Sequence, residues 1–167
     1  MTVHTSAGTR LSLSADAPAS FDSTGYEALT YTAVGEITDL GEFGREYSLV
    51  THNPIGTRGT QKFKGSFNEG TMNLTIGLDT ANAGQVLMQA ASMADSAYSF
   101  EVDMQNGDTY YFQAMVMSWK VNVGSVDSMT TASVTLELTT SDDGTGVIEV
   151  LPTPPAAPAF RPKVKAD

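Results

Sequence analysis

Apolar and polar side chains alternate with a period of two residues in four segments of the chain. Such alternation places the apolar side chains on one face of a β-strand and the polar side chains on the other. We therefore expect a mainly β protein in which several strands each bury one face. The apolar positions of the four segments are Leu11 and Leu13; Met72, Leu74, Ile76 and Leu78; Tyr98, Phe100, Val102 and Met104; and Val134, Leu136 and Leu138.

The segment 110–123 differs, because large apolar side chains occur there at both odd and even positions. We expect both faces of this strand to be covered. Asn106-Gly107 lies just before it, and this dipeptide favours the positive φ angles of a type I′ turn. Residues 97–123 are therefore predicted to form one β-hairpin.

One segment, from about Thr80 to Ala94, has the spacing of an amphipathic helix. Asp79 precedes it and is the predicted N-cap. We expect this single helix to lie across one face of the sheet or to close the end of a barrel. Its apolar residues recur at intervals of three and four, at Ala83, Val86, Leu87, Ala90 and Met93 or Ala94.

Residues Asp39 to Gly59 follow neither period. The segment is rich in glycine, yet it also carries the apolar residues Phe43, Leu49 and Ile55. Loops longer than about 12 to 15 residues are uncommon inside compact domains unless they have a function. We therefore predict a long functional loop between two strands.

The charges are unevenly distributed along the chain. Nine Lys and Arg against 19 Asp and Glu give a formal net charge of -10, and Arg161, Lys163 and Lys165 follow a proline-rich stretch near the end. We predict a folded domain over residues 1–151 and a Pro-rich basic C-terminal tail over residues 152–167. The acidic domain is expected to repel nucleic acid, which argues against sequence-specific DNA binding; the acidity would also keep the protein soluble.

The sequence offers little support for catalysis. Cysteine is absent, which excludes disulfides and thiolate chemistry, and the two histidines, His4 and His52, are not at a metal-ligand spacing. Asp142-Asp143-Gly144 is typical of a turn rather than of a calcium loop. We expect no enzymatic activity, no cofactor and no metal. We also expect no membrane span, because no run approaches the ~18 apolar residues that a span needs.

Two stretches resemble segments of the major tail tube proteins of long-tailed bacteriophages (siphoviruses), the lambda-like tail tube family. Residues 35–44, GEITDLGEFG, are similar to the strand and loop start of that family. Residues 62–75, KFKGSFNEGTMNLT, are similar to its short strand, Gly-containing turn and long alternating strand. The order of the later elements matches as well, so that the resemblance covers about residues 5–150.

The resemblance implies a β-sandwich or partly open barrel with one flanking α-helix and a long inter-strand loop. It also implies that six copies form a ring and that stacked rings form the tail tube through which the genome passes. The implied partners are further copies of this chain, other tail proteins such as the tape measure and tail terminator proteins, and genomic DNA that slides through without specific binding. The implied location is the virion tail, assembled in the host cytoplasm.

Two groups of residues are candidates for roles in such a tube. A lumen wall should not hold phosphates, which favours carboxylates over Lys and Arg. Carboxylates on the polar faces of alternating strands are therefore expected in the lumen, although the outer surface is open to them too; these are Glu101, Asp103 and Glu137. The apolar residues of the long loop are expected to contact the next ring; these are Phe43, Leu49 and Ile55.

Three alternatives stay open from the sequence. The first is the inner-tube protein of a contractile secretion or tail-like system. The second is a carbohydrate-binding β-sandwich module, for which Trp119 with Tyr110 and Tyr111 would be the aromatic platform. The third is an enzyme that uses Glu101 and Asp103 as a general acid and base, since two residues apart on one strand they share a face.

Overall fold

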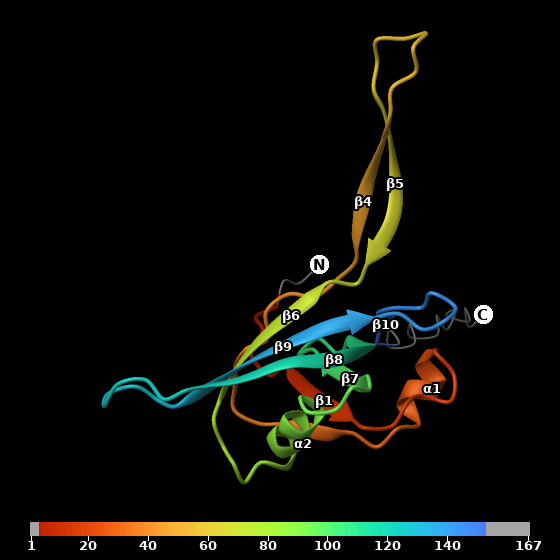
Figure 1. The fold of residues 1–167 in the computed structure, drawn as a ribbon. Helices are drawn as coiled ribbons and strands as arrows, with labels where there is room; N and C mark the ends of the chain where they lie inside the picture. Colours follow the sequence, from red (N-terminus) through yellow and green to blue (C-terminus); the bar gives the residue numbers. More distant parts are fainter. Residues whose placement is uncertain (1–3, 153–167) are drawn as a thin grey trace, which may run out of the picture.

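The computed structural model describes residues 4–152, and within these residues the chain is mainly β (Figure 1). The strands are β1 (Arg10–Ser14), β2 (Thr32–Val34), β3 (Ile37–Asp39), β4 (Glu46–His52), β5 (Gln61–Asn68), β6 (Thr71–Gly77), β7 (Tyr98–Asp103), β8 (Thr109–Asn122), β9 (Thr131–Thr139) and β10 (Ile148–Val150). The helices are α1 (Ser23–Glu27) and α2 (Ala83–Ala91). The predicted tail falls, from residue 153 onward, outside the described residues, so the division at residue 151 stays a prediction.

Eight strands form one antiparallel sheet in the order β2-β1-β7-β8-β9-β6-β3, with β10 paired to the start of β8. Strands β2 and β3 lie at opposite ends of this order, yet only Gly35 and Glu36 separate them in the chain. The sheet must therefore curl until its two ends meet at one corner. The N–H of Gly77, at the end of β6, donates to the carbonyl of Glu36 at 2.7 Å beside this corner. The predicted class is confirmed: a β-sandwich-like fold without a closed barrel.

The predicted alternation accounts for the core. The inward side chains of β1, β6, β7, β8 and β9 are buried together with Met88 and Ala91 of α2. Helix α2 approaches β2 closely at Gly84, where an added Cβ would lie 2.2 Å from the carbonyl oxygen of Ala33. A side chain at this position would push the helix away from the sheet.

The helix prediction needs two corrections. Helix α2 is shorter than predicted, and its N-cap is Asn82 rather than Asp79, because the Asn82 Oδ1 accepts the Gln85 N–H at 3.0 Å. The Asp79 carboxylate instead accepts the N–H of Ala81 in the preceding turn. The expectation of a single helix was also wrong, since the five-residue α1 precedes β2, capped by Asp22.

The predicted hairpin is confirmed, because β7 and β8 pair from Tyr98 opposite Ala114 to Asp103 opposite Thr109. Its turn is not type I′, since Gly107 has φ 90° but Asn106 has no positive φ. Coverage of both faces of β8 holds only for its first half. A β-bulge after Val116 marks the change, and beyond it the strand becomes increasingly exposed.

The predicted loop from Asp39 to Gly59 is wrong, because much of it is strand. Strand β4 pairs with β5 in a separate two-stranded sheet, which projects far from the main sheet (Figure 1). We call β4, β5 and the turn between them, residues 46–68, the arm. Both faces of the arm are exposed. With no buried face to select for alternation, the sequence of β4 does not show the period of a strand.

Candidate assembly surfaces

The arm is fixed at its base by a buried carboxylate. The Glu69 side chain is buried, and Arg45 donates from Nε to its Oε1 at 2.8 Å and from Nη2 to the same oxygen. This hydrogen bond with Glu69 raises the pKa of Arg45. Two glycines with positive φ, Gly44 and Gly70, stand next to the pair. The chain therefore enters and leaves the arm at one defined point.

The two faces of the arm differ in chemistry. Because side chains alternate along a strand, the register places Lys62, Lys64, Leu49, Tyr47 and Phe67 on one face. The Lys64 ammonium lies 4.4 Å from the centroid of the Tyr47 ring on this face. We call it the cationic face. The opposite face carries the apolar side chains of Val50 and Phe63 beside the polar side chains of His52 and Gln61.

The arm exposes large apolar side chains to solvent. Leu49 is 64% exposed, Phe63 54%, and Ile55, in the turn, 106%. A two-stranded ribbon is marginally stable by itself in water, and large apolar side chains exposed on both of its faces favour contact with another molecule. The arm is thus a surface suited to contact with another protein.

The hairpin of β8 and β9 forms a second projection, at a different side of the molecule from the arm (Figure 1). Its outer part also exposes apolar side chains, among them two methionines, which adapt readily to a partner's shape. The exposed residues are Met117, Val121, Val123, Val126 and Met129.

The structure separates the three apolar residues predicted for the long loop. Leu49 and Ile55 lie on the arm and are exposed. Phe43 lies before the arm, partly buried against the core, with its ring centroid 5.4 Å from that of Tyr110 and 5.7 Å from that of Phe112. Phe43 therefore anchors the segment that leads into the arm.

The three predicted carboxylates share one face of the sheet, opposite to the face that forms the core. The register places Glu101 across from Tyr111 and Glu137 across from Met115, both on the outer face of β8. All three are partly buried. Asp103 accepts a hydrogen bond from the Thr109 hydroxyl at 2.9 Å, and Glu137 accepts one from the Thr71 hydroxyl at 2.7 Å.

Glu101 is the most perturbed of these groups. Burial, followed by the neighbouring Asp103 carboxylate, raises its pKa to about 7. It lies beside tyrosines brought by α1 and the segment that follows it: Tyr26 stacks on Tyr111 at 5.5 Å, and the Tyr31 ring is 6.2 Å from that of Tyr111. The raised pKa thus has a structural cause in the packing of this aromatic cover.

The geometry gives little support to the carbohydrate-binding alternative or to a metal site. Tyr110 and Tyr111 lie on opposite faces of β8, and Trp119 packs against the core cluster, so the three rings form no binding platform. Within residues 4–152, no group of three or more His, Asp or Glu is placed to hold a metal ion. Asp142-Asp143-Gly144 is a turn, as predicted, closed by the Gly144 N–H on the Ser141 carbonyl.

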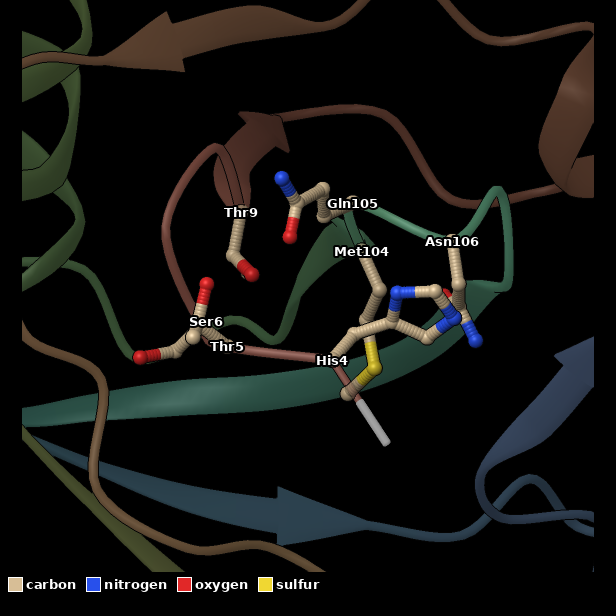
Figure 2. A pocket seen from close by; sticks show the side chains of 7 residues that line it. All are labelled: His4, Thr5, Ser6, Thr9, Met104, Gln105 and Asn106. Carbon is tan, nitrogen blue, oxygen red and sulfur yellow. The ribbon is translucent and has the colours of Figure 1, made fainter. Parts of the chain in front are cut away.

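A hollow of about 360 Å³ lies between the N-terminal segment and the β7–β8 turn (Figure 2). The His4 ring lies beside Asn106 and Met104, and the other lining residues are Thr5, Ser6, Thr9 and Gln105. None of these is a carboxylate, and Glu101 and Asp103 do not line this hollow. The side chains here offer no acid and base pair for catalysis.

Among the described residues, no helix is long and apolar enough to cross a membrane. No protein-family model matches this sequence, and no curated protein matches it.

Chains of three solved assemblies share this fold. A chain of the cryo-EM structure of the anti-feeding prophage baseplate, 6-fold symmetrised, has a TM-score of 0.64 at 10% identity, covering 90% of this chain and 97% of that one. A second similar chain comes from the sheath/tube terminator structure of an extracellular contractile injection system, PVC, in its extended state. It has a TM-score of 0.65 at 10% identity, covering 90% of this chain and 99% of that one. A chain of the SPP1 tail tube structure has a TM-score of 0.54 at 14% identity, covering 84% of this chain and 75% of that one.

Proposed function

We propose that this chain is a structural subunit of a tail-like tube, which assembles with copies of itself into rings that stack. The observation that carries the proposal is the arm, which exposes apolar side chains on both faces and projects from an otherwise well-packed sheet. The shared fold with chains of a tail tube, a baseplate and a sheath/tube terminator structure supports it. The role is structural and does not require catalysis.

In the finer form of the proposal, six copies form each ring, and the stacked rings form the tail tube of a long-tailed phage that conducts the genome. Leu49 and Ile55 on the arm contact the next ring, and Phe43 anchors the arm's lead-in segment. Glu101, Asp103 and Glu137 line the lumen, where carboxylates would not hold DNA phosphates. Further partners are other tail proteins, such as a tape measure and a tail terminator, in a virion assembled in the host cytoplasm.

A second candidate is the tube of a contractile injection system. The fold likeness to chains of the anti-feeding prophage and PVC structures favours it. Both candidates require self-assembly, and they differ in the partner around the tube. Co-assembly with a contractile sheath protein would separate them.

Excising the arm tests the shared part of the proposal. Because Glu46 and Asn68 are paired across its base, residues 47–67 can be replaced by Asn-Gly, which favours a tight hairpin turn. We expect the native chain to form rings or tubes with a central hole in electron micrographs. The excised variant should stay folded, with native-like circular dichroism and cooperative unfolding, but should no longer stack.

Two outcomes would contradict the proposal. One is a native chain that stays monomeric in light scattering at every concentration tested. The other is an excised variant that stacks as readily as the native chain. A map of the assembled tube would test the lumen assignment separately, because Glu101, Asp103 and Glu137 on the outer wall would contradict it.

A further inference from the structure

Positive and negative charges are segregated between the arm and the body of this protein. The arm together with the Arg45–Glu69 pair at its base, residues 45–69, contains four of the nine Lys and Arg but only two acidic residues, Glu46 and Glu69. The remaining described residues, 4–44 and 70–152, contain two basic residues, Arg10 and Lys120, and sixteen acidic ones. A basic arm thus projects from a strongly acidic body.

Three cations of the arm form no ion pair with any carboxylate of residues 4–152. Among the described residues the Arg45–Glu69 contact is the one ion pair, which leaves Arg58, Lys62 and Lys64 without one. All three are exposed. Lys62 and Lys64 share the cationic face with Leu49, so this face combines positive charge with exposed apolar area.

We propose that the cationic face of the arm docks onto the acidic body of a second copy of this chain. Charge complementarity identifies the occupant, because the body of every copy carries the charge that the arm lacks. Nucleic acid fits less well, since the same acidic body repels phosphates and the exposed Leu49 and Tyr47 suit a protein surface. This inference rests on the proposed self-assembly and specifies its chemistry.

The receiving surface is the margin of β3. Glu36, Asp39 and Glu42 lie along β3 and its flanks, are exposed, and form no ion pair among the described residues. Strand β3 is also the last in the sheet order, so no strand of the described part of the chain pairs with its outer edge. An open edge offers backbone hydrogen bonds in addition to the carboxylates.

The arm and the β3 margin are different surfaces of the same chain. A contact between them is therefore heterologous, and every bound copy presents a free arm or a free margin to the next. Such contacts propagate from copy to copy. Because each contact pairs opposite charges, assembly should weaken in about 1 M salt, where the Debye length falls to about 3 Å.

Two complementary variants test this inference. The first reverses the arm, with Arg58→Glu, Lys62→Glu and Lys64→Glu. The second reverses the margin, with Glu36→Lys, Asp39→Lys and Glu42→Lys. Each variant alone brings like charges together, and we expect its critical concentration for assembly to rise by at least about tenfold. An equimolar mixture restores opposite charges at every contact and should assemble at close to the native concentration.

A matched control carries Asp16→Lys, Asp95→Lys and Asp142→Lys, which changes the net charge as much as the margin variant does. All three positions are exposed and lie away from β3 in the sequence, so this control should assemble like the native chain. Circular dichroism and thermal unfolding of every variant establish that it is folded, as expected for exposed positions.

Three results would overturn the inference while leaving the proposed function intact. They are normal assembly of the arm variant alone, failure of the mixture when the control assembles, and binding of duplex DNA by the native chain that the arm variant loses. Failure of the native chain to assemble would instead count against the proposed function itself.

Discussion

Replacing Gln85 with leucine should destabilise the subunit without touching the arm. The Gln85 side chain is 2% exposed and joins three parts of the chain where the ends of the sheet meet. Its Oε1 accepts the N–H of Asp79 at 2.9 Å, and its Nε2 donates to the carbonyls of Gly35 at 3.0 Å and Gly77 at 2.8 Å. Helix α2 is thereby tied to the β2–β3 link and to the end of β6.

The magnitude follows from those three hydrogen bonds. Leucine is similar in size to glutamine, so the main loss is the pairing of one N–H and two carbonyl groups of the backbone. A hydrogen bond contributes about 0.5 to 1.5 kcal/mol net, and a buried group left unpaired costs about 1 to 3 kcal/mol. We expect Gln85→Leu to lower the free energy of unfolding by about 3 kcal/mol. For a chain of this size, that corresponds to a fall in Tm of roughly 6 to 12 °C.

The assay is urea and thermal unfolding followed by circular dichroism, at a protein concentration at which the native chain is monomeric. Gln89→Leu is the matched control, because Gln89 is an exposed glutamine on the same helix, and its effect should stay within about 0.5 kcal/mol. Equal stability of Gln85→Leu and the native chain would refute the assigned role. The corner of the sheet would then be held by packing, without need of these hydrogen bonds.

Two further predictions concern local electrostatics and helix capping. The pKa of Glu101 is raised from 4.5 to about 7, so the folded state binds an extra proton between these values and its stability should fall as pH rises through this window. The full pKa shift corresponds to a loss of about 3 kcal/mol in the free energy of unfolding, which solvent contact should reduce to about 1 to 2 kcal/mol. The Glu101→Gln variant should lack this dependence of stability on pH when urea midpoints are compared at pH 5 and pH 8. An unchanged pH dependence in the variant would contradict the assignment. Asn82→Ala should lower the free energy of unfolding by about 1 kcal/mol, measured by thermal unfolding, because it removes the N-cap of α2. Asn82→Asp should keep most of this stabilisation, since aspartate also caps helices. Equal losses of stability in both variants would argue against the capping role.

The sequence predicted the strands that bury one face, because the core itself imposes the alternation. Leu74 and Leu136 are buried at positions that the alternation predicts. The same reasoning failed for β4, where Leu49 and Val50 are adjacent and both exposed. It also failed to place the helix start, since Asp79 and Asn82 are both capable caps and tertiary contact with Gly35 distinguishes them.

The candidate surfaces were predicted in part. Leu49 and Ile55 were identified from their isolated apolar character, but the arm that carries them depends on pairing with β5, which no local pattern shows. The Arg45–Glu69 contact joins residues 24 positions apart and could not be foreseen. One signal was present and unused, namely the cluster of Arg58, Lys62 and Lys64 in an otherwise acidic chain.

The closed base of the arm has a consequence for how tube dimensions can change in evolution or by engineering. The chain enters and leaves the arm at paired positions, Glu46 and Asn68, so residues can be added to both strands without displacing the large sheet. Adding one residue to each strand would exchange the two faces, whereas adding two would preserve them. Each permitted step lengthens the arm by about 7 Å. In an assembly built on arm contacts, the spacing between subunits would therefore change in discrete increments, with the same residues facing the neighbour each time.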